Sequence, residues 1–336
     1  MWRKVYIILV MIAAFLGTHL GCEDMPEEGS FTTIEVPQQA EVGLAEPVEL
    51  FPLDLPEGMT RLRLGVTPAL GIDVAQKSNA PLGSYLSDVL RIPVDIVVAD
   101  SYDQLTTLIA NEEVELALLP PLSYVKAKEE VEDLVPVVGK IGRGASHYSS
   151  YVLVRAEGSL QNLKDLKGKR LAFVDPTSSS GFLLPYDYLM RNGIDPEDDL
   201  KSMTFAGSHA AALRMLALGQ VDAAASGSGI REILKSELQD VDGAGDTRLR
   251  ILANAGPIPY GAVCARSGFP EAGIRKVRRA FLQLNTMSPQ GRTIWRASGD
   301  ITGWMLPNDL VYAGLRRKLS RVRKWRSESK GERVSQ

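Results

Sequence analysis

The sequence contains few of the residues that build metal centres and covalent crosslinks. Only two of its 336 residues are cysteines, Cys22 and Cys264, and only three are histidines, at positions 19, 147 and 209. The histidines lack the spacing of a metal-binding motif, so we expect no metal site and no cofactor. Cys264 has apolar neighbours and is expected to pack as a small hydrophobic residue, without forming an intrachain disulfide.

The sequence also lacks a long apolar run and a basic surface pattern. The apolar run at residues 5–16 has twelve residues, which is short for crossing a bilayer. The net charge is −3, and no basic stripe is interleaved with aromatic residues, which argues against nucleic-acid binding. No repeat of solenoid type occurs.

Charge is distributed unevenly along the chain. Residues 22–58 contain ten acidic residues and no Lys or Arg, whereas residues 315–336 contain nine basic and two acidic residues. The acidic part contains prolines and has no clear periodicity, so residues 23–60 are predicted to be a flexible tether. The basic C-terminal tail, residues 316–336, is predicted to be a solvated helix end, with binding to anionic lipid headgroups as the alternative.

The first 22 residues have the pattern of a targeting segment. Arg3 and Lys4 precede the apolar run, and Leu20-Gly21-Cys22 resembles the lipobox of bacterial lipoproteins, whose cysteine is lipidated after cleavage. The match departs from the usual pattern at His19, where an aliphatic residue is common. We expect a lipoprotein-type signal peptide and a lipid anchor on Cys22, with an ordinary secretory signal or an uncleaved anchor as alternatives.

Between the two charged ends, the sequence alternates between strand and helix patterns. With 45% hydrophobic and 24% charged residues, the chain can bury a large core, and its length favours two lobes. The alternation predicts an α/β fold with mostly parallel sheets flanked by helices, and ligands bind such sheets at the carboxyl ends of strands. Residues 203–209 are predicted to be a strand, a glycine turn and then His209, followed by a helix over 210–218. Other strands are predicted at 61–68, 92–98, 114–119, 135–141, 150–154, 171–174, 221–225, 249–253 and 260–265, and helices over 270–320.

Residues 171–193 are the most informative stretch. A short apolar strand ends at Asp175-Pro176, and Thr177-Ser178-Ser179-Ser180-Gly181 then leads into a helical pattern. Hydroxyl groups on the first turn of a helix, together with its unpaired N–H groups and partial positive charge, favour an oxyanion. The alternative is that one serine caps the helix and the others only fill the turn.

Several stretches together resemble one family, the substrate-binding proteins of phosphate, phosphite and phosphonate ABC transporters, of the phosphonate-binding type. The resemblance covers about residues 62–315 and implies a two-lobed periplasmic-binding-protein fold with two crossing hinge segments. On that basis we expect lobe 1 at 61–150 plus 258–315 and lobe 2 at 151–257. The matching stretches are Leu-Leu-Pro-Pro-Leu-Ser-Tyr at 118–124, Tyr-Ser-Ser-Tyr-Val-Leu-Val at 148–154, Leu-Lys-Asp-Leu-Lys-Gly at 163–168, Asp-Pro-Thr-Ser-Ser-Ser-Gly at 175–181, Gly-Ser-His at 207–209 and Gly-Gln-Val-Asp-Ala-Ala at 219–224.

The resemblance also implies roles for seven residues. The family's hydroxyls, which hold the phosphonate oxygens, match Ser178, Ser179 and Ser180, and its cleft histidine matches His209. The tyrosines that reach from the other lobe match Tyr102 and Tyr124, and an acid that could accept from a protonated oxyanion matches Asp222. These residues also have structural alternatives: His209 could cap a helix, the two tyrosines could pack in the core, and Asp222 could accept hydrogen bonds from a nearby turn.

The sequence departs from the family where aminoalkylphosphonate binders carry acids for the ligand's ammonium group. The corresponding stretches, 226–230 and 257–262, contain no acid, although a loop acid such as Asp242 could substitute. A buried ammonium without a partner costs several kcal/mol. We therefore expect poor binding of 2-aminoethylphosphonate and favour phosphate, phosphite or a small alkylphosphonate.

Three classes of function are compatible with these residues. The first is a monomeric, non-enzymatic binding protein that delivers its ligand to an ABC permease. The second is a binding protein of the same fold that signals to a membrane sensor kinase. The third is a serine hydrolase using Ser179, His209 and Asp222, although the Gly-x-Ser-x-Gly motif of many hydrolases is absent around Ser179.

Overall fold

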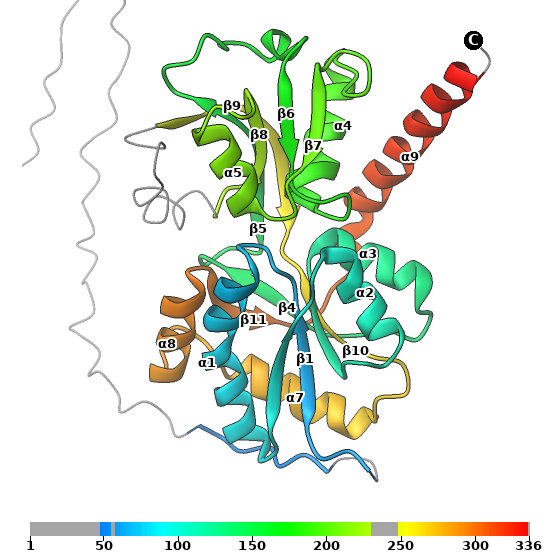
Figure 1. The fold of residues 1–336 in the computed structure, drawn as a ribbon. Helices are drawn as coiled ribbons and strands as arrows, with labels where there is room; N and C mark the ends of the chain where they lie inside the picture. Colours follow the sequence, from blue (N-terminus) through cyan, green and yellow to red (C-terminus); the bar gives the residue numbers. More distant parts are fainter. Residues whose placement is uncertain (1–47, 55–57, 230–247, 335–336) are drawn as a thin grey trace, which may run out of the picture. The chain divides into compact units, whose positions relative to one another are not determined.

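The computed structural model describes residues 48–54, 58–229 and 248–334, with side chains described as far as residue 328. These residues belong to one unit of the chain, residues 45–336, in which helices flank two separate β-sheets (Figure 1). The expected signal peptide, the lipidation site Cys22 and most of the expected tether lie outside the described residues, as does Asp242. In the described part, no helix is both long and apolar enough to span a bilayer.

The first sheet has the strand order β11-β4-β10-β3-β1-β2. Helices α1, α7 and α8 pack on one face, and α2 and α3 pack on the other. Its strands are β1 (Leu62–Val66), β2 (Val94–Val98), β3 (Leu116–Leu119), β4 (Val135–Gly142), β10 (Ala262–Ala265) and β11 (Ile301–Met305). Its helices are α1 (Ile72–Leu90), α2 (Tyr102–Ala110), α3 (Pro121–Glu130), α7 (Glu271–Leu282) and α8 (Pro289–Ser298).

The second sheet has the order β7-β6-β8-β5-β9. Helix α5 (His209–Ala217) covers one face, and a π-helical turn, η2 (Ser179–Leu183), continues into α4 (Leu184–Arg191) on the other. The chain enters this sheet between β4 and β5 and leaves it between β9 and β10. Its strands are β5 (His147–Arg155), β6 (Arg170–Phe173), β7 (Ser202–Phe205), β8 (Ala223–Gly227) and β9 (Leu249–Pro259), with a 3₁₀ turn η1 (Leu163–Leu166) before β6.

The α/β architecture agrees with the sequence prediction, but both sheets are mixed rather than mostly parallel. Strand β1 pairs in parallel with β2 and β3, as β6 does with β7 and β8. The antiparallel pairs involve β10 and β11 in the first sheet and β5 and β9 in the second. Strands β5, β9 and β10 lie next to the two connections between the sheets, and β11 joins the first sheet late in the chain. Chain direction at these crossings depends on the path of the whole chain, which local patterns do not reveal.

The prediction of helices over 270–320 was wrong at β11. Helix α8 ends at Gly299, whose φ of 66° is a left-handed conformation that glycine adopts without a steric penalty. The following residues, 301–305, then pair antiparallel with β4. Ile301 and Trp304 are buried by this pairing, so the strand is stabilised by tertiary contacts.

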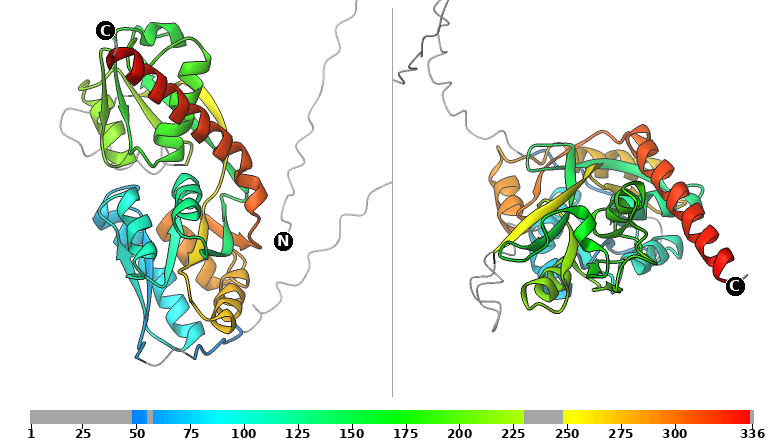
Figure 2. Two further views of the ribbon diagram at one scale, coloured as in Figure 1. Left: turned by 90° about the vertical axis from the view of Figure 1, so that its right-hand side faces the viewer. Right: turned by 90° about the horizontal axis from the view of Figure 1, so that it is seen from above.

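The described parts of the two charged ends, residues 48–54 and the C-terminal helix, pack against the rest of the protein. Phe51 and Leu53, within the expected tether, are buried, and their N–H groups donate to Val89 and Leu90 of α1, each at 2.8 Å. The basic tail forms most of α9 (Ala313–Val334), which lies alongside elements of both sheets (Figure 2). Its arginines form ion pairs with acids on or near α3, α4 and η3 (Asp309–Tyr312): Arg323–Glu129, Arg321–Asp187, Arg326–Glu197 and Arg316–Asp309.

Candidate functional site

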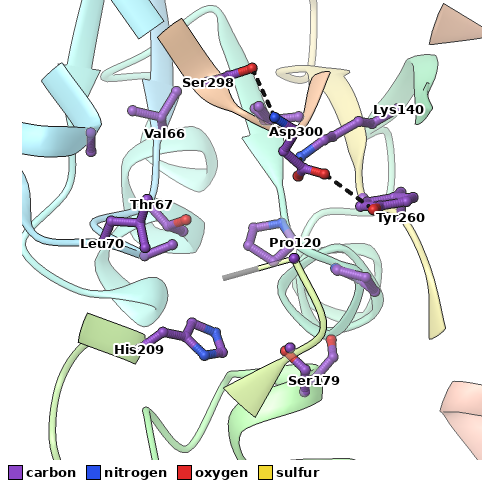
Figure 3. Close-up of a pocket in the computed structure, with 18 of the residues that line it drawn as sticks. Val66, Thr67, Leu70, Pro120, Lys140, Ser179, His209, Tyr260, Ser298 and Asp300 are labelled. Carbon is purple, nitrogen blue, oxygen red and sulfur yellow. Dashed lines mark hydrogen bonds and ion pairs between the residues drawn. The ribbon is translucent and has the colours of Figure 1, made fainter. Parts of the chain in front are cut away.

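A cavity of about 210 Å³ lies between elements of the two sheets. Residues from the end of β1 and the loop after it, from the ends of β3 and β8, and from the connection before β10 line it, as do residues at the N-terminal ends of several helices. The cavity is therefore at the carboxyl ends of parallel strands, where ligands bind in open α/β sheets. Figure 3 shows some of the lining residues, with His209 and Ser179 on one side and Lys140, Tyr260 and Asp300 on another.

Four helix beginnings supply lining residues: Tyr102 of α2, Pro121 of α3, Ser179 of η2 and His209 of α5. Each helix starts shortly after a strand, so the β-to-α connections bring the four beginnings to one place. Serine side chains fix three of these starts, because Ser101, Ser178 and Ser208 each accept from the third backbone N–H beyond them. The partial positive charges of the helix N-termini make the cavity favourable for an anion.

The hydroxyl-rich turn contributes three of the predicted residues to the cavity lining. Ser178 Oγ accepts from the Gly181 N–H at 3.0 Å, Ser179 Oγ accepts from the Leu122 N–H at 2.8 Å, and the Ser180 carbonyl accepts from Ser150 at 2.8 Å. Ser178 is thus an N-cap, as the alternative interpretation of the turn proposed, and it still lines the cavity. Each hydroxyl retains an O–H that can donate to a ligand.

Gly181 is required for this turn. A Cβ at this position would lie 2.3 Å from Val174 Cγ2 and 2.4 Å from Val174 Cβ, on the strand-end residue before the turn. The absence of a side chain therefore lets the turn pack directly against the end of β6. This contact holds the serines at the cavity.

His209 is buried and uncharged. Its Nδ1 is 3.0 Å from Ser226 Oγ, and burial lowers the pKa of its ring to about 3. A neutral imidazole presents one donor and one acceptor, so Ser226 influences which of them faces the cavity. The backbone N–H of His209 donates to Ala69 of the first sheet's β1–α1 loop at 3.0 Å.

The two predicted tyrosines are in different places. Tyr102 lines the cavity, and burial raises the pKa of its hydroxyl, which therefore remains a donor. Tyr124 does not line the cavity: its hydroxyl donates to Asp309 Oδ1 at 2.7 Å, and its ring packs against Tyr312. Tyr124 is thus packed in the core, which is the structural alternative to a ligand contact.

Asp222 is separated from the cavity by a strand. It precedes β8, and Gly227 at the other end of β8 lines the cavity, about 16 Å away at about 3.3 Å per residue. Its carboxylate accepts from Arg170 Nε at 3.1 Å, Nη2 at 2.9 Å and the backbone N–H at 2.9 Å. The hydrogen bond to Arg170 lowers the pKa of Asp222 to about 2.

These positions do not assemble a hydrolase triad. Asp222 is paired with Arg170, and the ring nitrogen Nδ1 of His209 is bonded to Ser226 rather than to an acid. A ring whose pKa is about 3 is also a weak general base at neutral pH.

Among the cavity residues that sequence reasoning missed, Lys140, Tyr148, Tyr260 and Asp300 form one cluster. Lys140 forms an ion pair with Asp300, whose Oδ1 also accepts from the Tyr260 hydroxyl at 3.1 Å, and Tyr148 stacks on Tyr260. Tyr148 lies in a stretch that resembled the family, and Tyr260 lies in residues 257–262, which were compared with the family only for an acid. The pairing of β11 with β4 brings Asp300 next to Lys140.

The formal charges on the cavity wall balance. Among the described residues that line it, Lys140 and Asp300 are the charged ones, and they neutralise each other. The described residues also contain no group of acids, histidines and cysteines suited to a metal ion. Attraction for an anion in this cavity therefore comes from helix N-termini, hydroxyls and N–H groups.

Polar contacts join elements of the two sheets at the edge of the cavity. Besides the Leu122–Ser179 and His209–Ala69 bonds, Lys126 Nζ donates to Thr177 Oγ1 at 2.7 Å, and Arg143 donates to the Gly229 carbonyl at 3.2 Å. Ser179 thus contributes both to the cavity wall and to the contact between the two sheets' elements.

Comparisons with known proteins agree with the geometry. A family model described as "ABC transporter, phosphonate, periplasmic substrate-binding protein" matches residues 64–312. The phosphate-import protein PhnD of Mycolicibacterium smegmatis is 34% identical over 177 residues, covering 50% of this chain and 54% of that protein. The probable phosphite-binding protein PhnD1 of Prochlorococcus marinus is 24% identical over 169 residues, covering 49% of this chain and 57% of that protein. The matches thus span little more than half the length of these curated relatives.

Solved structures show the same fold. The structure of PhnD1 from Prochlorococcus marinus in complex with methylphosphonate has a TM-score of 0.69 and 19% identity, and covers 79% of this chain and 99% of that one. A binding protein of a phosphonate transporter from Pseudomonas aeruginosa has a TM-score of 0.69 and 18% identity, covering 77% and 85%. The predicted two-lobed periplasmic-binding-protein fold is confirmed, and the chain belongs to the family of periplasmic substrate-binding proteins of phosphonate ABC transporters.

Proposed function

We propose that this chain captures a small phosphorus oxyanion in the cavity between its two sheets and delivers it to an ABC permease, without catalysing a reaction. The observation that carries the proposal is the convergence of four helix beginnings and three serines on a cavity whose formal charges cancel. The candidates are phosphate, phosphite and a small alkylphosphonate, consistent with the ligands in the names of the related proteins.

Five of the residues predicted from the sequence would hold the oxyanion: Ser178, Ser179, Ser180, Tyr102 and His209. All line the cavity, and each offers an O–H or a ring nitrogen. A hydrogen bond to a charged group contributes roughly 1.5–3 kcal/mol, so several of them are enough for micromolar affinity, about 8 kcal/mol. Because Tyr124 and Asp222 have other partners and do not line the cavity, the proposal leaves them out.

The proposed lobes are the two sheets with their helices, and the boundaries near residues 150 and 258 stay a prediction. The crossings lie between β4 and β5 and between β9 and β10. Closing the lobes on the ligand would form or tighten the contacts of Ser179 with Leu122 and of His209 with Ala69. The permease would then recognise the ligand-bound protein by the closed arrangement of its two lobes.

We also propose that the protein works outside the cytoplasm as a monomer, held to the membrane by lipid on Cys22. The observations are the lipobox-like Leu20-Gly21-Cys22 and the apolar run before it. Mass spectrometry of the N-terminal peptide would detect the acyl chains. An N-terminal peptide that carries no acyl chain on Cys22 would contradict the anchor.

Calorimetric titration tests the binding function. The purified chain, stripped of bound ligand, is titrated with phosphate, phosphite and methylphosphonate, and sulfate serves as a comparison anion. Saturable micromolar or tighter binding of at least one phosphorus oxyanion is expected. If all three fail to bind, the proposal is overturned.

A further inference from the structure

The Lys140, Tyr260 and Asp300 side chains form a polar cluster that the proposed oxyanion contacts do not use. Lys140 and Asp300 come from the first sheet, on β4 and just before β11, whereas the serines and His209 come from elements of the second. Figure 3 shows the cluster on the side of the cavity away from His209 and Ser179. An oxyanion held by the serines would therefore direct its substituent towards the cluster.

The cluster is held in one arrangement. The Lys140 and Asp300 side chains are 16% and 24% exposed, and the Asp300 N–H donates to Ser298 Oγ at 3.3 Å. The Tyr260 ring, stacked on Tyr148 with centroids 4.8 Å apart, also lies 5.1 Å from Lys140 Nζ. Burial acts to raise the pKa of Asp300, but Lys140 and Tyr260 outweigh it and hold that pKa below its usual range. The cluster therefore presents an ammonium and a carboxylate in fixed positions.

Both charged groups retain hydrogen-bonding capacity. A carboxylate has about four acceptor positions, and Asp300 uses one for Lys140 and one for the Tyr260 hydroxyl. An ammonium has three donors, and among the described residues Asp300 is the hydrogen-bonding partner of Lys140 Nζ. The cluster thus offers a donor and an acceptor side by side, and the charges of Lys140 and Asp300 cancel. Arg143, whose backbone N–H donates to the Asp300 carbonyl at 2.9 Å, adds a positive charge nearby that also lowers the pKa of Asp300.

The contacts that a ligand substituent can form with Lys140 and Asp300 depend on its charge and on its hydrogen-bonding groups. A ligand ammonium can only donate, and it would add a second cation beside Lys140. A ligand carboxylate can only accept, and it would face Asp300. An apolar group would leave both unused positions unpaired, which is costly in a buried site. A hydroxyl can donate to Asp300 and accept from Lys140 without adding charge.

We propose that Lys140, Tyr260 and Asp300 form a subsite for a neutral hydroxyl substituent, so that the cleft selects a short hydroxyalkylphosphonate. The inference rests on the proposed oxyanion binding and names the ligand class of that same cavity. The cavity volume of about 210 Å³ is far larger than the roughly 10–15 Å³ that a cavity needs to hold one water. It therefore has room for a short substituent beyond the phosphonate group.

The subsite also extends what the sequence predicted for 2-aminoethylphosphonate. The two stretches that carry acids in aminoalkylphosphonate binders have none here, and the acid that does line the cavity is Asp300. Because Lys140 already neutralises Asp300, this acid is not available as the sole partner of a ligand ammonium. The expectation of poor binding therefore stands as a prediction, with a different physical reason.

Four phosphonates of similar size test the subsite by calorimetry on the purified full chain: 2-hydroxyethylphosphonate, propylphosphonate, 2-aminoethylphosphonate and phosphonoacetate. All carry the same phosphonate group, so they differ only at the subsite. We expect the hydroxyethyl compound to bind at least tenfold more tightly than each of the others, where tenfold is about 1.4 kcal/mol. Equal or tighter binding of any of the other three overturns the subsite while leaving the oxyanion function intact. No binding of any phosphonate or of phosphate overturns the proposed function as well.

The double variant Lys140→Met with Asp300→Asn removes both charged groups and keeps the charge balance. We expect its preference for 2-hydroxyethylphosphonate over propylphosphonate to fall below threefold, while propylphosphonate binding shows that the cleft is intact. Asp222→Asn, which alters an acid outside the cavity, is the matched control and should keep the full preference. A preference that survives in the double variant contradicts the subsite. If the double variant does not fold, the ligand series on the unchanged protein still decides the question.

Discussion

The two sides of the cavity differ in how they are built. The side that we assign to the oxyanion consists of residues close together in the sequence, Ser178 to Ser180, together with His209 at the start of α5. The side that we assign to the substituent joins Lys140, Tyr260 and Asp300, which lie on three separate strands or strand ends. The first side presents neutral donors and helix N-termini, and the second presents the Lys140–Asp300 ion pair.

Because of this difference, we expect the two sides to have separate roles, one in holding the oxyanion and one in selecting its substituent. Neutral donors at helix ends can hold any small oxyanion, since they recognise oxygens and negative charge. A fixed pair of one donor and one acceptor distinguishes between ligand substituents, since a substituent that cannot both donate and accept leaves one member of the pair without a hydrogen bond. Variants on the first side should therefore weaken the binding of all phosphorus oxyanions, and variants on the second should change their ranking.

Ser179→Ala should cause the largest loss of affinity. The variant removes a donor to the oxyanion and also leaves the Leu122 N–H without its 2.8 Å partner. A hydrogen bond to a charged group contributes roughly 1.5–3 kcal/mol, so methylphosphonate should bind about 10- to 150-fold more weakly in calorimetry. Ser123→Ala is the matched control, because this buried hydroxyl has no hydrogen-bonding partner in the described part of the protein. Equal losses in the two variants would contradict the assigned role of Ser179.

The burial of His209 should make the protein less stable in acid. The unfolded chain binds a proton at this ring near pH 6.5, whereas the folded chain binds it only near pH 3. Between those values the unfolded state holds more protons, so the free energy of unfolding should fall as the pH decreases, by at most about 1.4 kcal/mol per pH unit. Urea unfolding at several pH values, compared with His209→Gln, measures this slope. An identical slope in the variant would mean that other groups cause it.

Tyr260→Phe should have a smaller effect, confined to the second side of the cavity. The variant removes the hydroxyl that donates to Asp300 at 3.1 Å but keeps the ring that stacks on Tyr148. Methylphosphonate has no hydroxyl substituent, so its affinity should change less than threefold. A loss comparable to that in Ser179→Ala would place Tyr260 among the oxyanion contacts instead.

Asp222→Asn should leave ligand affinity unchanged within about twofold. The carboxylate is bonded to Arg170 at the end of β8 remote from the cavity. Thermal unfolding should nevertheless show lower stability, because the charged bonds to Arg170 are weakened. A tenfold loss of methylphosphonate affinity in this variant would return Asp222 to the binding site.

The two sides also differ in how far the sequence revealed them. The hydroxyl-rich turn could be predicted, because a strand, a proline and a serine run ending in Gly181 specify a helix start locally, and Gly181 is needed for its contact with Val174. Most strands were predicted for the same reason, since period and turn residues are local signals. Asp300 could not be predicted, because its position depends on β11, a strand defined by antiparallel pairing with β4. Asp222 illustrates the opposite case: its motif was present, but the residue lies at the end of β8 remote from the cavity, where it is paired with Arg170.

A crystal structure of the complex with 2-hydroxyethylphosphonate tests the central claim most directly, because it shows which end of the ligand faces which side of the cavity. We predict that the phosphonate oxygens lie within hydrogen-bonding distance of Ser178, Ser179, Ser180 and His209, with the hydroxyl between Lys140 and Asp300. A phosphonate group bound against Lys140, with the hydroxyl towards the serines, would contradict this account.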